Sequence, residues 1–210
     1  MPEKPRTIGE HYFDEAKIAW ALPDGEHEGS GWFKGFKLVK TPRMLLVVDN
    51  SEYWPREREP GRYNYASLRI AVYPRPEHLE QFDKSAEILK PGGPAEEFPG
   101  AIGSIYVSTT SRPVLSVNYV QSHFKIGSGK YQIPASLARE YAGWRKLALT
   151  ELVRTAHSRD LKVHFPHKLI PRKPGAEIFA KQLECVAGET NSEVEKTETH
   201  TILRKRRSER

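Results

Sequence analysis

A glycine-containing loop holds the residues whose types and spacing best suit ligand binding. Residues 124–130 read Phe-Lys-Ile-Gly-Ser-Gly-Lys, between a predicted strand and the longest predicted helix. Consecutive backbone N–H groups in such a loop, with a helix N-terminus beyond it, can hold a phosphate. The candidate cofactor-binding residues are therefore Lys125, Gly127, Ser128, Gly129 and Lys130.

The loop departs from two known phosphate-binding patterns. It is not a Walker loop, because Phe124 stands where the first glycine is needed and Tyr131 where Ser or Thr should bind magnesium. It is not a dinucleotide fingerprint, since only two of the three glycines are present. The competing interpretation is a loop that only connects the strand to the helix. Glycine-containing loops of this kind more often connect elements than bind phosphate.

The basic C-terminus is a second candidate site. The formal net charge is +6, and the last seven residues contribute +4, so the rest of the chain is nearly neutral. A flexible cationic run binds nucleic-acid phosphates without reading base edges, and it can equally bind an acidic protein. The competing interpretation is a solvated tail that only aids solubility. The candidate nucleic-acid-binding residues are Arg204, Lys205, Arg206, Arg207 and Arg210.

The histidines do not form a metal motif in the sequence. His164 and His167 make an H-x-x-H at the end of a predicted strand, and His157 and His123 lie elsewhere. A spacing of three in an extended strand does not bring both rings together, and zinc needs a third or fourth ligand. We therefore assign no metal site.

No residue is assigned a catalytic role, and whether the chain is an enzyme is left open. Lone carboxylates on predicted helices are usually solvated surface groups. Tyrosines near Arg69 could present an aromatic and basic face to single-stranded RNA, although aromatic residues are enriched in strands for packing alone. The carboxylates are Glu140, Glu151, Asp83 and Glu87, and the tyrosines are Tyr63, Tyr65 and Tyr73.

Hydrophobic periodicity predicts the elements that position these residues. Apolar residues three and four apart predict helices at 10–22, 76–89, 135–158 and 176–186. Alternating or continuous apolar runs predict strands at 32–40, 43–49, 67–72, 102–109, 114–121 and 161–165. Hairpins followed by helix, strand and helix indicate an α+β fold. We expect a mainly antiparallel sheet with helices packed on it and a C-terminal β-α-β-α unit.

Composition divides the chain into a body and a tail. Residues 1–187 are expected to form a single α+β domain, with Leu147 and Leu152 of the long helix in its core. From Gly188 onward the chain has few apolar residues and no aromatic one. We therefore expect residues 188–210 to be a disordered basic tail.

Five consecutive elements resemble the cofactor-binding half of the GNAT superfamily of N-acetyltransferases. They lie within residues 114–186: strand, glycine loop, long helix, strand and last helix. The resemblance rests mainly on their order. It implies that the loop binds the pyrophosphate of acetyl-CoA, or another acyl-CoA, through backbone amides.

The match to that family's Gln/Arg-x-x-Gly-x-Gly/Ala motif is partial. Gly127 and Gly129 occupy its two small positions, but Phe124 replaces its Gln or Arg. The family also often uses a tyrosine on the last helix to protonate the departing thiolate, and none follows Tyr141 here. The resemblance implies an acyl-CoA-binding, N-acetyltransferase-like domain. The alternative is a non-catalytic module that binds nucleic acid or protein through its basic tail.

Cysteine use and hydropathy indicate a cytoplasmic protein. The single Cys185 can form no internal disulfide, and apolar helical neighbours predict that its thiol is buried. The charged N-terminus lacks the apolar region of a signal peptide. The longest apolar run, residues 44–48, is far shorter than the roughly 20 residues of a membrane span.

Overall fold

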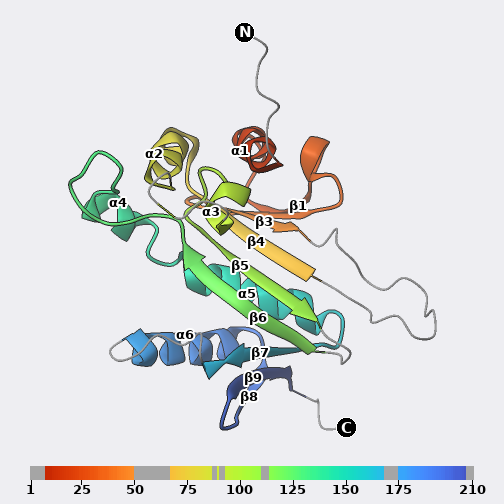
Figure 1. The fold of residues 1–210 in the computed structure, drawn as a ribbon. Coiled ribbons are helices and arrows are strands. Elements are labelled where there is room, and N and C mark those ends of the chain that lie inside the picture. The colour runs from red at the N-terminus through yellow and green to blue at the C-terminus, as the bar shows by residue number, and fades with distance from the viewer. Residues whose placement is uncertain are drawn as a thin grey trace. The chain divides into compact units, whose positions relative to one another are not determined.

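The computed structural model describes residues 8–49, 67–86, 89, 93–109, 114–167 and 175–206 of the chain. In chain order the elements are α1 (Ile8–Ala19), β1 (Gly25–Glu28), the 3-10 helix η1 (Gly31–Phe33), β2 (Lys37–Lys40), β3 (Leu45–Asp49), β4 (Ser67–Tyr73), α2 (Pro76–Ala86), α3 (Pro94–Glu97), β5 (Gly103–Thr109), β6 (Val114–Ser122), α4 (Ala135–Glu140), α5 (Trp144–His157), β7 (Lys162–Pro166), α6 (Gly175–Glu189), β8 (Ser192–Lys196) and β9 (His200–Lys205). Figure 1 shows their arrangement.

The described strands confirm the predicted α+β class with a mainly antiparallel sheet. They are hydrogen-bonded in the order β1-β2-β3-β4-β5-β6-β7-β9-β8. Strands β6 and β7 pair in parallel, whereas β1 with β2, β2 with β3, β3 with β4, β7 with β9 and β8 with β9 pair antiparallel. The complete C-terminal β-α-β-α unit, including the hand of its crossover, stays a prediction.

The chain divides into two compact units. The first comprises Met1–Ser51, Arg69–Ser104 and Gln121–Trp144, and the second comprises Glu52–Leu68, Ile105–Val120 and Arg145–Arg210. The expectation that residues 1–187 form a single domain stays a prediction.

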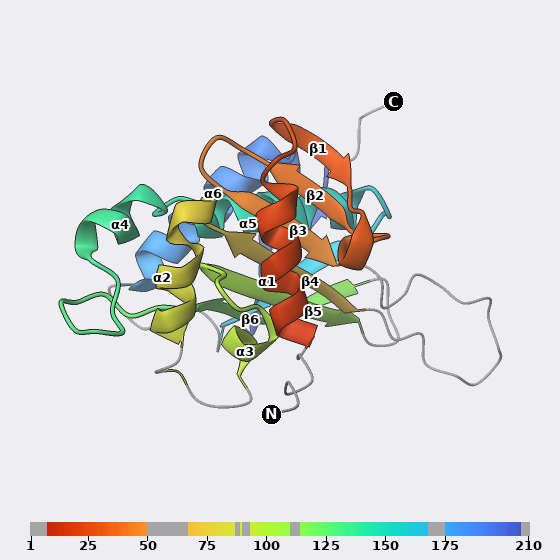
Figure 2. The ribbon, with the colours of Figure 1, turned by 90° about the horizontal axis from the view of Figure 1, so that it is seen from above.

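In the first unit, α1 forms because its apolar residues repeat at helical spacing. Tyr12, Ala16 and Ala19 are buried at positions i, i+4 and i+7, which makes one continuous apolar face. Figure 2 looks down on α1, which lies across β3 and β4. The expected helix over residues 10–22 is therefore present.

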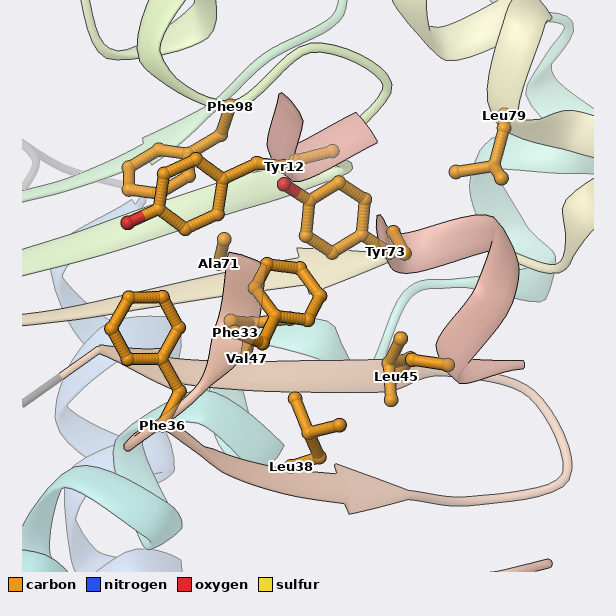
Figure 3. Close-up of a cluster of buried hydrophobic side chains, with 13 residues drawn as sticks. Tyr12, Phe33, Phe36, Leu38, Leu45, Val47, Ala71, Tyr73, Leu79 and Phe98 are labelled. Atoms are coloured by element: carbon orange, nitrogen blue, oxygen red, sulfur yellow. The ribbon is translucent and has the colours of Figure 1, made fainter. Parts of the chain in front are cut away.

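Aromatic rings form the centre of the core beneath α1 (Figure 3). Tyr12 lies with its ring centroid 5.5 Å from that of Phe33, 5.8 Å from Phe36 and 5.3 Å from Phe98. Its hydroxyl donates a hydrogen bond of 2.8 Å to the buried carboxylate of Asp49. Aromatic pairs at these separations add about 0.5–1.5 kcal/mol each beyond area burial.

The β2–β3 hairpin turns at Thr41 and Pro42, the two residues between the strands predicted at 32–40 and 43–49. The Thr41 N–H donates to the carbonyl of Met44, and the Met44 N–H donates to the Thr41 hydroxyl, both at 2.9 Å. This local closure fixes the register at Lys40 opposite Leu45. Every residue of β3 is buried, as expected for a central strand.

The long helix predicted over residues 135–158 is broken into α4 and α5. Residues 141–143 form a turn between them, in which the Trp144 N–H donates to the carbonyl of Tyr141. The break falls beside Gly143, and glycine is unfavourable in the interior of a helix. On α5, Leu152 is fully buried, whereas Leu147 is only half-buried.

The apolar spacing of the helix predicted at 176–186 indicates that Ile178, Phe179, Leu183 and Val186 all face the core. Phe179, Leu183 and Val186 are buried, but Ile178 is 62% exposed and was predicted wrongly. The expected burial of the Cys185 thiol was wrong too, since it is exposed. Both residues lie off the buried i, i+4, i+7 face, and a helix with one covered side leaves such positions in solvent.

The predicted disordered tail was wrong for residues 188–206. Helix α6 continues to Glu189, and β8 and β9 then pair as an antiparallel hairpin. Strand β9 also pairs antiparallel with β7, and its residues Ile202 and Leu203 are buried. The strand is ordered because it lies within the sheet, between β7 and β8. Residues 207–210, including Arg207 and Arg210, lie outside the described residues.

Candidate functional site

The glycine loop is held in place by contacts at its start. The ring of Phe124 meets that of Phe82 edge-on, with centroids 5.4 Å apart. The Lys125 N–H donates to the hydroxyl of Ser85 on α2 at 3.4 Å. The loop therefore begins from a fixed position on the first unit.

Hydrogen bonds within the loop occupy the N–H groups of Gly127 and Gly129, which a bound phosphate would need. The Gly127 N–H donates to the carbonyl of Ile133 at 3.1 Å, and the Gly129 N–H donates to Oε1 of Gln132 at 3.0 Å. The Ile133 N–H returns to the carbonyl of Lys125 at 2.8 Å. Gln132 side-chain atoms would also lie within 3.4 Å of a Cβ placed on either Gly127 or Gly129, which explains why glycine suits both positions.

The predicted phosphate-binding residues are thus brought together without forming a cradle of unused amides. The side chains of Lys125, Ser128 and Lys130 are exposed, and the Lys130 ammonium lies 5.0 Å from the centre of the Tyr131 ring. The helix that follows, α4, has only six residues and begins after Pro134. An anion at this loop would be bound by lysine side chains more readily than by the N–H groups of Gly127 and Gly129.

In the second unit, the parallel strands β6 and β7 separate after a short paired stretch. Their register comprises Val114 opposite Lys162, Leu115 opposite Val163, and Ser116 opposite His164. Strand β6 continues to Ser122, whereas its register with β7 ends at Ser116 opposite His164. Figure 1 shows the two strands close at their starts and diverging along their lengths. An extended ligand can in general pair with the edge of a strand as a further strand would.

Tyr141, the last tyrosine of the chain, is not placed to protonate a ligand. It is fully buried, its hydroxyl lies 2.7 Å from Nδ1 of His78, and it accepts a hydrogen bond from the Arg75 N–H at 3.2 Å. Burial raises the pKa of Tyr141 to about 12. The side chain therefore ties α4 to α2 and stays neutral.

The predicted basic site is partly neutralised by neighbouring carboxylates. Nε of Arg204 lies 2.9 Å from Glu193, and its Nη1 lies 3.8 Å from Glu195. Nζ of Lys205 lies 4.0 Å from Asp160. Arg206 is exposed. The residues placed on β9 therefore belong to a mixed-charge sheet surface, where exposed pairs contribute about 0–1 kcal/mol each.

The proposed aromatic RNA face is not supported at its described positions. Tyr73 is fully buried in the core of the first unit, and Arg69 is half-buried opposite Asp49. Tyr63 and Tyr65 lie outside the described residues. Among the carboxylates that were considered, Glu151 is buried and accepts a hydrogen bond from Thr155, and Glu87 is likewise outside the described part.

The two histidines of the H-x-x-H sequence, His164 and His167, contact different residues. His167 uses Nδ1 with the carbonyl of Glu198 at 3.1 Å and Nε2 with the Thr201 hydroxyl at 3.4 Å. His164 instead has its ring centroid 5.6 Å from that of His200. Within the described residues, no group of three or more His, Cys, Asp or Glu side chains could hold a metal ion.

A buried serine–histidine pair was missed by sequence reasoning. Oγ of Ser104 lies 2.9 Å from Nε2 of His123, and both residues are fully buried. A nucleophile and base at this distance suit acyl transfer in an open site, but their burial assigns this pair to the interior structure. A separation of 19 positions along the chain gave no local signal.

His123 should make the protein sensitive to acid. Burial lowers its pKa to about 4, with the Phe98 carbonyl opposing that shift. Because the folded pKa lies below the unfolded value of about 6.5, the neutral form stabilises the fold above pH 6.5, and this contribution is lost as the pH falls toward 4. We expect a loss of about 3 kcal/mol across that window.

The variant His123→Gln isolates this effect because its amide can still bond Ser104 but does not titrate. Urea unfolding of both proteins at several pH values measures the effect. Between pH 7 and pH 4 the unfolding free energy of the parent should fall by about 3 kcal/mol more than that of His123→Gln. A difference that stays constant with pH would show that His123 is not the titrating group.

None of the described helices is long and apolar enough to span a membrane. Comparison with protein families, with characterised proteins and with solved structures yields no match to this chain.

Proposed function

We propose that the chain binds acyl-CoA as an N-acetyltransferase-like domain, with no catalytic residue assigned. The observation that carries the proposal is the divergence of β6 and β7 after Ser116 and His164. The arm of CoA is an extended chain with two amide groups. Such a chain can hydrogen-bond to the edge of a strand as a further strand would.

The order of elements around β6 supports the same proposal. The glycine loop follows β6, helices α4 and α5 come next, and β7 returns parallel to β6. This is the order on which the resemblance to N-acetyltransferases rests. Because the N–H groups of Gly127 and Gly129 have internal partners, the proposal rests on the strands and not on the loop.

Acetyl-CoA is expected to stabilise the full-length protein. At a concentration 100-fold above its dissociation constant, the gain in unfolding free energy should be about 2.7 kcal/mol. Thermal unfolding with increasing acetyl-CoA measures this gain. No shift in Tm at millimolar acetyl-CoA would rule out the proposed function.

Hydrogen exchange followed by mass spectrometry locates the binding. Acetyl-CoA should slow exchange in residues 117–120 of β6, and β2 provides an internal reference. Two fragments serve as matched ligands: S-acetylpantetheine should protect β6, whereas adenosine 3′,5′-bisphosphate, which lacks the arm, should not. Protection by acetyl-CoA that leaves β6 unchanged would place the ligand elsewhere.

A further inference from the structure

The sheet of the second unit has one covered face. Alternate residues of β5, β6, β7 and β9 are at most 1% exposed, namely Ile105, Val107, Leu115, Val117, Val163 and Leu203. Helix α5 lies behind β5 and β6 in Figure 1. Because successive side chains of a strand point to opposite faces, the residues between these buried ones lie on the other face.

The other face is continuous from β5 to β9 and reaches solvent. Nδ2 of Asn118 on β6 donates a hydrogen bond of 2.8 Å to the hydroxyl of Ser108 on β5. Ser116 of β6 stands opposite His164 of β7, which in turn stands opposite Ile202 of β9. Residues directly opposite each other, and residues two apart on one strand, share a face. We call this surface the open face, and its half-buried or exposed residues include Tyr106, Ser116, Asn118, His164 and His200.

Aromatic rings are spread across the open face. The ring centroid of Tyr106 on β5 lies 5.7 Å from that of Tyr119 on β6. The centroids of His164 on β7 and His200 on β9 are 5.6 Å apart. Nδ1 of His200 lies 2.7 Å from the hydroxyl of Thr199, which orients its ring. Half-buried rings on an open sheet are surfaces on which unpaired bases of a nucleic acid can stack.

Cationic side chains accompany these rings. Lys162 is two residues before His164 and Arg204 is two residues after Ile202, so both share the open face, and both are exposed. Glu193 and Glu195, which contact Arg204, lie on β8, at the far side of this face from β5. Strand β9 also leads into the basic end of the chain, whose last seven residues contribute +4. Positive charge beside the rings favours a ligand with a phosphate backbone.

We propose that the open face binds single-stranded nucleic acid, with bases stacked on Tyr106, His164 and His200 and phosphates beside Lys162 and Arg204. The bases of a duplex stack on one another and cannot reach rings on a sheet, so the ligand is single-stranded. Binding is largely independent of base sequence, because every base presents a flat face to stack. The site consists of sheet side chains and does not rest on acyl-CoA binding.

Fluorescence anisotropy with the full-length chain tests the proposal. The probe is a fluorescein-labelled oligouridine of about twelve nucleotides, within the usual site size of single-strand-binding domains. Tyr106→Leu, His164→Leu and His200→Leu each remove a ring and should each weaken binding about fivefold or more. Trp32→Leu is the matched control, because Trp32 is a 46% exposed aromatic residue of the first unit, and it should bind as the parent does. Oligothymidine of the same length shows whether the face prefers RNA or DNA.

Two further readouts keep the test independent of the variants' folding. Oligouridine should shift the ring NMR signals of His164 and His200 in the parent protein, and a duplex of the same length should bind more weakly. Circular dichroism confirms that each variant is folded. The proposal would be overturned by absence of binding at low salt, by equal binding of the parent and all three ring variants, or by equal binding of duplex and single strand. The last result would assign binding to the basic C-terminus instead, which contacts phosphates alone.

Discussion

A chain truncated after Ala187 is expected to lose about 3 to 6 kcal/mol of unfolding free energy. The deletion removes Ile202 and Leu203, which are 8% and 0% exposed, and burial of each is worth about 1.5–3 kcal/mol. It also removes β9, the antiparallel partner of β7. Urea unfolding of the truncated and full-length chains measures the loss.

A chain ending at Arg206 is the control, because it keeps both β8 and β9. Its unfolding free energy should exceed that of the chain ending at Ala187 by the same 3 to 6 kcal/mol, estimated again as roughly 1.5–3 for each buried residue. Equal stability of the two truncated chains would mean that the C-terminal hairpin contributes nothing, as the polar composition from Gly188 first suggested.

Leu152→Ala is expected to destabilise the protein by about 2–5 kcal/mol. The side chain is fully buried on α5, so truncation removes its transfer free energy and leaves a cavity. Thermal or urea unfolding of the purified variant measures the loss.

Leu147→Ala on the same helix is the matched control. Leu147 is only half-buried, so the same chemical change should cost less than at Leu152. A larger loss at Leu147, or a loss below about 0.5 kcal/mol at both sites, would show that α5 presents a different face to the core.

Local patterns in the sequence were enough to predict several elements. The repeat of Tyr12, Ala16 and Ala19 specified α1, because one turn of helix spans 3.6 residues. Thr41 and Pro42 specified the β2–β3 turn, since its hydrogen bonds join residues only three apart. The α+β class followed from the succession of such elements.

Contacts between distant residues were decided only by the tertiary structure. Ser104 pairs with His123, and His164 meets His200, because sheet pairing brings separate strands together. The tail shows the same limit, because Ile202 and Leu203 are too few to predict an ordered segment from composition. Both are nevertheless buried on β9, which lies between β7 and β8 in the sheet. The glycine loop was recognisable from its residues, but the internal partners of Gly127 and Gly129 were not. Residue types and spacing report local propensity, whereas burial and hydrogen-bond partners depend on which segments the fold places side by side.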